Sequence, residues 1–225
     1  MIINLDFSVD LDEVRRYLGY QPGKTEDSVA VDNLLLETQA AIGRAARPRG
    51  RYRTFPLLKS SATELYLPTG GLRLASSNLA ALWQQAEQVS LLAVTLGPKV
   101  DSFIASLLAQ ERYAQAAIAD AIGSAAAEAA MEQLNNLLAQ EVTASGMTLT
   151  RRFSPGYGDV PLQVQEQLGQ ALGVSDLGIV VTANFLLIPR KSITAMVGWQ
   201  LAGQAVCQPA KNCDLCNMEN CSYKR

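Results

Sequence analysis

The stretch Arg152-Phe153-Ser154-Pro155-Gly156-Tyr157 combines a fixed cation, a stiff turn and an aromatic tip within a few residues. Proline fixes its own φ and glycine permits backbone conformations closed to other residues, so the chain at Gly156 can approach a ligand closely. Arg152 can grip a carboxylate through two parallel hydrogen bonds, and Tyr157 offers a ring face and a hydroxyl. The stretch therefore indicates either a site for a small molecule that carries a carboxylate or an ordinary surface turn.

Composition favours a globular protein whose main partner is not a nucleic acid. The 225 residues are 48% apolar, which is enough for a sizeable core. The formal net charge is −2, and no basic stripe interleaved with aromatic residues is present. Five arginines nevertheless cluster in one short segment, which we expect to be a solvated loop, with a site for phosphate or an acidic partner as the alternative. They are Arg44, Arg47, Arg49, Arg51 and Arg53.

Neither a signal peptide nor a membrane span is predicted. The first residues, 1–6, lack the basic region and the long apolar stretch of a signal peptide. The longest apolar segment, Leu177–Pro189, contains Thr182 and Asn184 and resembles buried sheet more than a membrane helix. We therefore expect a cytoplasmic protein without a membrane partner.

Histidine is absent from the sequence. This absence excludes Ser-His-Asp and Cys-His nucleophiles and all His-ligated metal or haem sites. Any acid–base chemistry would have to use carboxylates, lysine, tyrosine or cysteine. We therefore expect a protein that binds and orients a reactive cofactor and has no catalytic residue of its own.

The pattern of apolar residues and breakers predicts a single α+β domain, with helices packed on a largely antiparallel sheet. Helices are predicted over residues 10–19, 28–46, 77–87, 100–110, 113–144 and 162–172. Extended segments are predicted over residues 2–7, 51–68, 89–96, 178–181, 185–188 and 193–201. No long linker or internal repeat divides the chain.

The helix predicted over residues 113–144 carries a row of polar residues at a spacing of four. Asp120, Ser124, Glu128 and Glu132 share one side of the helix, and its other side is alanine, isoleucine and leucine. The row is either a solvated face of an amphipathic helix or a set of acids that face an ammonium or sulfonium group.

All four cysteines lie near the end of the chain, in the pattern C-x5-C-x2-C-x4-C. Such a compact set of thiols predicts a metal site, and two disulfides are disfavoured in a reducing cytosol. A [4Fe-4S] cluster is our first assignment, because structural zinc usually uses two C-x2-C pairs and only one such pair is present. The alternatives are a zinc site and free or redox-active thiols. The predicted ligands are Cys207, Cys213, Cys216 and Cys221.

Three segments together resemble the activation domain of cobalamin-dependent methionine synthase. Arg152–Tyr157 resembles that family's Arg-x-Ala-Pro-Gly-Tyr motif, Ala119–Glu128 resembles the helix that precedes the motif, and Ile188–Trp199 resembles the strand that follows it. The matches occur in family order and cover roughly residues 85–200, whereas residues 1–84 resemble the front half of standalone members more weakly.

The resemblance implies a compact, C-shaped α+β domain around a curved antiparallel sheet. Residues 1–84 would form the front half of this domain and residues 85–203 its activation-domain-like core. Residues 204–225 have no counterpart in the methionine synthase domain, and we assign them as a cysteine-rich metal-binding tail from the cysteine spacing alone. It also implies a task, the reductive reactivation of a corrinoid. An electron donor such as a flavodoxin or ferredoxin returns inactive cob(II)alamin to cob(I)alamin, which takes the methyl group of S-adenosylmethionine and becomes methylcobalamin.

The same resemblance assigns the ligand contacts. Arg152 would hold the carboxylate of S-adenosylmethionine, while the backbone from Ser154 to Gly156 and the side chain of Tyr157 would contact its adenosine part. An ungapped alignment places Ser124 where the family has an acid for the ligand's ammonium group. We therefore expect Glu128, one turn later, to bind the ammonium group, with Asp120 as the second candidate.

The corrinoid itself would have to come from another protein. The chain lacks a corrinoid-binding module and its Asp-x-His-x-x-Gly signature, so we expect it to act in trans on a corrinoid-binding protein or a cobalamin-dependent methyltransferase. Two alternatives remain. One is a non-catalytic docking module with a structural metal site, and the other is an iron–sulfur protein that activates corrinoids by electron transfer alone.

Overall fold

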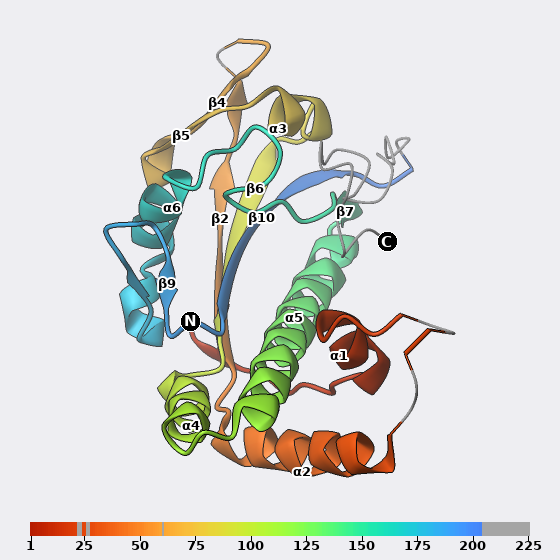
Figure 1. Cartoon of the computed structure of the whole chain (residues 1–225). Helices are drawn as coiled ribbons and strands as arrows, with labels where there is room; N and C mark the ends of the chain where they lie inside the picture. Colours follow the sequence, from red (N-terminus) through yellow and green to blue (C-terminus); the bar gives the residue numbers. More distant parts are fainter. Residues whose placement is uncertain (22–23, 26–27, 60, 204–225) are drawn as a thin grey trace.

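A curved five-stranded sheet, antiparallel throughout, organises the chain (Figure 1). The computed structural model describes residues 1–21, 24–25, 28–59 and 61–203. The strand order is β1-β2-β6-β10-β7. The strands are β1 (Ile3–Asn4), β2 (Arg49–Pro56), β6 (Gln88–Thr95), β10 (Ser192–Leu201) and β7 (Met147–Leu149).

Strand β6 is buried on both faces and separates two hydrophobic cores. Because side chains alternate along a strand, Leu92 and Val94 join one core while Leu91 and Ala93 join the other. This explains why the sequence of the strand is a continuous apolar run.

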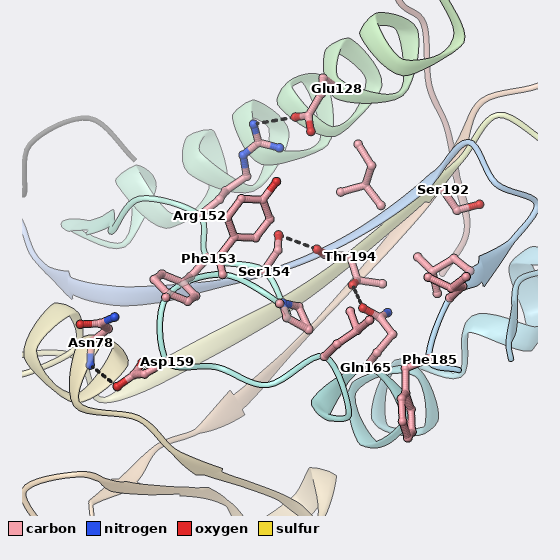
Figure 2. Close-up of a pocket in the computed structure, with 18 of the residues that line it drawn as sticks. Asn78, Glu128, Arg152, Phe153, Ser154, Asp159, Gln165, Phe185, Ser192 and Thr194 are labelled. Carbon is pink, nitrogen blue, oxygen red and sulfur yellow. Dashed lines mark hydrogen bonds and ion pairs between the residues drawn. The ribbon is translucent and has the colours of Figure 1, made fainter. Parts of the chain in front are cut away.

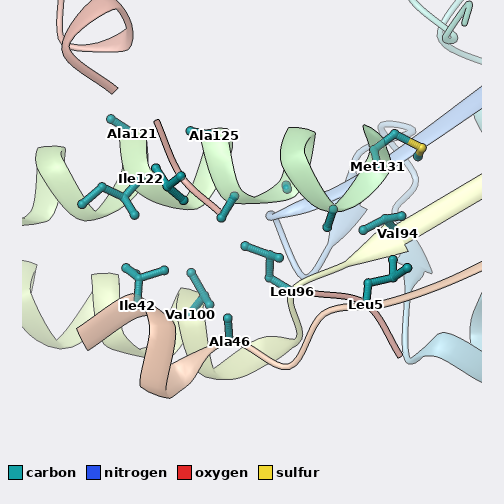
Figure 3. Packing of buried hydrophobic residues seen from close by; sticks show 14 of the residues in the cluster. Leu5, Ile42, Ala46, Val94, Leu96, Val100, Ala121, Ile122, Ala125 and Met131 are labelled. Atoms are coloured by element: carbon teal, nitrogen blue, oxygen red, sulfur yellow. The ribbon is translucent and has the colours of Figure 1, made fainter. Parts of the chain in front are cut away.

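Helices cover the first face of the sheet (Figure 1). They are α1 (Leu11–Tyr17), α2 (Val29–Ala45), α4 (Pro98–Ala109) and α5 (Tyr113–Ala144). The long α5 crosses the sheet and contributes Ile122 and Met131, both fully buried, to a core that also contains Ile42 of α2 and Val100 of α4 (Figure 3). The many alanines of α5 let it lie close to its neighbours, since small side chains permit close packing.

Smaller elements cover the second face. They are β3 (Leu58–Lys59), β4 (Glu64–Leu67), η1 (Pro68–Gly70), β5 (Leu72–Ala75), α3 (Ser77–Leu82), α6 (Val164–Leu172), η2 (Val174–Leu177), β8 (Val180–Val181) and β9 (Leu187–Ile188). Trp83, which follows α3 and is fully buried, anchors this second core together with Met196 of β10.

Three of the five clustered arginines do not lie in a solvated loop, so the prediction was wrong for them. Arg49, Arg51 and Arg53 lie in strand β2 and point to the end of α6 and the turn η2 that follows it. Their guanidinium groups donate to the backbone oxygens of four residues, at 2.6 to 3.0 Å: Ala171, Leu172, Gly173 and Leu177. The last carbonyls of a helix lack partners within the helix, and the negative end of its dipole favours cations there.

The predicted fold class is confirmed, as is a single domain with helices on an antiparallel sheet. Pairing of β2 with β6 joins residues on both sides of position 84 in one sheet, and the proposed division at residues 84 and 203 stays a prediction. The helix predicted over residues 77–87 ends already at Leu82, and the last two strands before β10 are shorter than predicted. No helix in the described part of the chain is long and apolar enough to cross a membrane.

Candidate functional site

An open pocket of about 1150 Å³ lies beside strand β10, between helix α5 and the elements of the second face, and the stretch Arg152–Tyr157 forms much of its wall (Figure 2). Helix α5 contributes Glu128, helix α6 contributes Gln165, strand β10 contributes Thr194, and the hairpin β8–β9 contributes Phe185. The volume slightly exceeds the range of about 300–1,000 Å³ that is usual for pockets that hold small molecules. The pocket has both charged and apolar walls.

The backbone of the stretch is fixed to strand β10. Phe153 exchanges two backbone hydrogen bonds with Met196, at 2.8 and 2.9 Å, and the hydroxyl of Ser154 donates to the carbonyl of Thr194 at 2.8 Å. Gly156 has a φ of +88°, which L side chains rarely adopt, and its N–H donates to Val160 at 2.9 Å. The proline–glycine turn therefore presents a rigid backbone to the pocket.

A second anchor holds the far end of this loop. Asp159 accepts hydrogen bonds from the hydroxyls of Ser76 and Ser77 and from the backbone N–H groups of Ser77 and Asn78, at the start of α3. Partial burial acts to raise the pKa of Asp159, but these hydrogen bonds outweigh it and leave the pKa below its ordinary value. The loop is thus tied to β10 at one end and to a helix N-terminus at the other.

Arg152 lies between two acids of helix α5. Its Nη2 is 3.5 Å from Glu128 Oε2 and 3.2 Å from Glu132 Oε2. The side chain of Arg152 is 26% exposed, whereas those of the two glutamates are about half exposed. A cation next to two accessible carboxylates matches the charges of an amino acid, whose carboxylate would pair with the arginine and whose ammonium would pair with a glutamate.

Asp120 takes another role. Its carboxylate is 2.8 Å from the ammonium of Lys191, which is 7% exposed and also donates to Ser124 at 2.9 Å. Gly123 makes room for this lysine, since a Cβ there would lie 3.0 Å from Lys191 Cε. Among the described residues that line the pocket, Glu128 is present and Asp120 is not. The polar row of α5 is therefore neither purely solvated nor wholly directed at the pocket.

Tyr157 lies at the pocket rim and is 65% exposed. The opposite wall is apolar and includes Phe185, Leu186 and Leu187 of the β8–β9 hairpin. Phe185 has a φ of +62°, an unfavourable conformation for a residue with a side chain, at the tip of the hairpin. An exposed tyrosine and an apolar wall can together hold a planar ring.

Several lining residues were not predicted as site residues, among them Asn78, Gln165, Arg190 and Thr194. Thr194 and Arg190 fall within the segment Ile188–Trp199 that resembles the family, so a signal for them existed. Gln165 and Asn78 carry no local signal, because only the packing of α6 and α3 against the sheet brings them to the pocket. The four predicted cysteine ligands lie outside the described residues, and the described part holds no other cluster of metal-ligating side chains.

Comparison with solved structures shows a likeness of fold. The fold is similar to that of a MetH reactivation domain bound to AdoHcy, S-adenosylhomocysteine. The TM-score is 0.60, and the match covers 88% of this chain and 77% of the MetH reactivation domain. Sequence identity is 15%, so the MetH comparison establishes a shared fold alone. Neither a family model nor a curated protein matches the sequence.

Proposed function

We propose that this chain binds S-adenosylmethionine in the pocket beside Arg152 and remethylates a corrinoid held by another protein. The observation that supports this proposal most strongly is that the stretch Arg152–Tyr157 lines a pocket and places Arg152 between two acids. The similarity of the fold to a MetH reactivation domain bound to AdoHcy supports the choice of ligand class.

The amino-acid end of the ligand would bind at helix α5. Its carboxylate would replace Glu128 and Glu132 as the partner of Arg152, and its ammonium would pair with Glu128, which lines the pocket. The existing ion pairs keep the arginine in place before the ligand arrives, which reduces the entropy lost on binding. Ser154, Gly156 and Tyr157 would contact the adenosine part.

The reaction would transfer one methyl group. One electron from a flavodoxin- or ferredoxin-like donor reduces the cob(II) corrinoid to the cob(I) state, whose electron pair then attacks the sulfonium methyl carbon. The carbon–sulfur bond breaks, methylcobalamin forms and neutral S-adenosylhomocysteine is released. The contribution of this chain would be to hold the sulfonium methyl opposite cobalt, an effect of proximity and orientation.

The cysteine tail would hold a [4Fe-4S] cluster that relays the electron, with zinc as the structural alternative. Four thiolates suit either metal. Iron and sulfide in anaerobically purified protein would support the relay, whereas stoichiometric zinc would refute it and leave a structural site.

A titration calorimetry experiment with S-adenosylhomocysteine tests the ligand assignment. We expect wild-type protein to bind and Arg152→Ala to bind at least tenfold more weakly, since loss of a charge-assisted pair costs about 1.5–3 kcal/mol. Arg112→Ala is the matched control, because Arg112 also pairs with a glutamate, Glu37, but lies outside the pocket. No binding by wild type at millimolar ligand would refute the proposal.

The two alternatives predict different behaviour. A docking module would bind its corrinoid partner equally well with and without S-adenosylmethionine. An activator that works by electron transfer alone would support corrinoid turnover in the absence of S-adenosylmethionine.

A further inference from the structure

Gln165 is a buried polar residue whose amide is only half satisfied. It is the second residue of α6, it is 4% exposed, and it lines the pocket. Its Oε1 accepts a hydrogen bond from the hydroxyl of Thr194 at 2.9 Å (Figure 2). Its Nε2 is buried and has no hydrogen-bond partner among the described residues.

An unpaired buried N–H is unusual, because the group has lost its hydrogen bond to water without a replacement. At the wall of a pocket, the acceptor for such a group can come from outside the folded chain, as an ordered water molecule or a ligand. The position of Gln165 on the pocket wall makes a bound ligand the natural source of that acceptor.

The orientation of the amide is set by the elements that form the binding site. Thr194 lies in β10, where it pairs with Ala93 of β6, and its carbonyl accepts the hydroxyl of Ser154. Its own hydroxyl holds the amide oxygen of Gln165, so the amide nitrogen points away from Thr194. Thr194 therefore connects Gln165 to Ser154, which lies in the same loop as Arg152.

The surroundings of Gln165 suit a flat ring better than a sugar. Leu162, Phe185 and Leu187 are apolar members of the lining on this side of the pocket. A ribose needs several polar partners for its hydroxyls, whereas a purine base buries its faces against apolar groups and needs few hydrogen bonds at its edge. Figure 2 shows Arg152 and Glu128 at the α5 side of the pocket and Gln165 at the α6 side, so one elongated ligand can reach both.

We infer that Gln165 is a specificity-determining residue that donates its Nε2–H to a ring nitrogen of the ligand's purine base. Thr194 is a positioning residue that holds the amide in this orientation. The inference rests on the proposed function, because it takes the ligand to be an adenosyl amino acid.

The test pairs protein variants with ligand variants. S-adenosylhomocysteine is compared by calorimetry with its 1-deaza, 3-deaza and 7-deaza adenine counterparts, each of which lacks one ring nitrogen. In the wild type, one of the three should bind about tenfold more weakly than the parent, the loss expected for one hydrogen bond. Gln165→Leu should bind the parent about tenfold more weakly and should no longer distinguish it from that deaza ligand.

Three control variants separate recognition from folding. Arg152→Ala should weaken the parent and all three deaza ligands by the same factor, because it acts on the other end of the ligand. Thr194→Ser keeps the hydroxyl and should still bind the parent more tightly than the affected deaza ligand. Thr194→Val removes the hydroxyl and should no longer distinguish these two ligands. The melting temperature of each variant shows whether it is folded, and Gln165→Met replaces Gln165→Leu if the leucine variant is unfolded.

The outcomes also separate this inference from the proposed function. If the wild type binds the parent but discriminates against no deaza ligand, or if Gln165→Leu retains the discrimination, the role of Gln165 is overturned and the proposed function stands. If the wild type does not bind S-adenosylhomocysteine at all, both are overturned.

Discussion

Individual charged residues in this structure have separable tasks. Arg152 and Glu128 lie at the pocket, while Asp120 and Ser124, two turns and one turn before Glu128 on the same helix, hold the buried ammonium of Lys191. The spacing of the acids was visible in the sequence. The sequence did not show which acid binds which cation. That depends on the fold, which brings Lys191 from the β10 segment to Asp120 and Arg152 from its loop to Glu128.

This division predicts opposite effects for two conservative substitutions. Asp120→Asn should lower the free energy of unfolding by about 1–3 kcal/mol, since it leaves a buried ammonium without its carboxylate, and it should leave the affinity for S-adenosylhomocysteine unchanged. Glu128→Gln should weaken ligand binding and change stability by at most about 1 kcal/mol, because its pair with Arg152 is accessible to water. Chemical denaturation and calorimetry measure the two quantities. Weaker binding with unchanged stability in Asp120→Asn would assign the ammonium to Asp120 instead.

Among the elements, strand β10 connects the pocket to the hydrophobic cores. It holds both the Arg152 loop and Gln165. Its side chains alternate, so Thr194 and Met196 face the pocket side while Ala195 and Val197 pack in the core beneath α5. Gly198 permits Trp83 to approach, because a Cβ there would lie 2.6 Å from the indole Cδ1.

A pair of glycine substitutions tests this close approach. Gly198→Ala should destabilise the protein by about 1–3 kcal/mol, the usual cost of overpacking a core. Gly43→Ala is the matched substitution in the exposed last turn of α2, where a Cβ meets nothing within 4 Å, and it should stabilise the helix by about 0.5–1 kcal/mol. Equal effects of the two changes on the melting temperature would contradict the packing described for β10.

The attachment of the Arg152 loop to α3 gives the protein a defined pH dependence. Because the folded-state pKa of Asp159 is lowered, its contribution to stability is complete above its unfolded-state pKa of about 3.8 and is lost as the pH falls through the lower folded-state value. Asp159→Asn should therefore be less stable than wild type at neutral pH, and the difference should shrink below about pH 4. Urea titrations from pH 2 to pH 7 measure this, and a difference independent of pH would contradict the role of the carboxylate.

At the scale of the whole molecule, the sequence predicted more of the fold than of the site. The apolar run of β6, the periodicity of α5 and the breakers between elements were sufficient for an α+β domain with an antiparallel sheet, and the structure confirms it. The arginines of β2 were misassigned because their partners are backbone carbonyls more than a hundred residues away. No local pattern records such a partner.

The same reason limits what the sequence could say about the pocket. The Arg152–Tyr157 stretch was identified because the whole motif is contiguous in the chain. Gln165, on α6, reaches the pocket only after that helix packs on the sheet. Its partner Thr194 follows at a distance of 29 residues, and nothing in the local sequence marks the two as a pair.

The proposed function requires this chain to deliver a methyl group from S-adenosylmethionine to a corrinoid on another protein. The direct measurement uses a corrinoid protein recovered by pull-down with this chain, set to the cob(II) state and supplied with a one-electron reductant and methyl-labelled S-adenosylmethionine. We expect labelled methylcobalamin to form, as monitored by its absorption spectrum. The rate of its formation should fall at least tenfold with Arg152→Ala and should be unchanged with Arg112→Ala. Label that never reaches cobalt, or equal rates for wild type and Arg152→Ala, would contradict the proposed function.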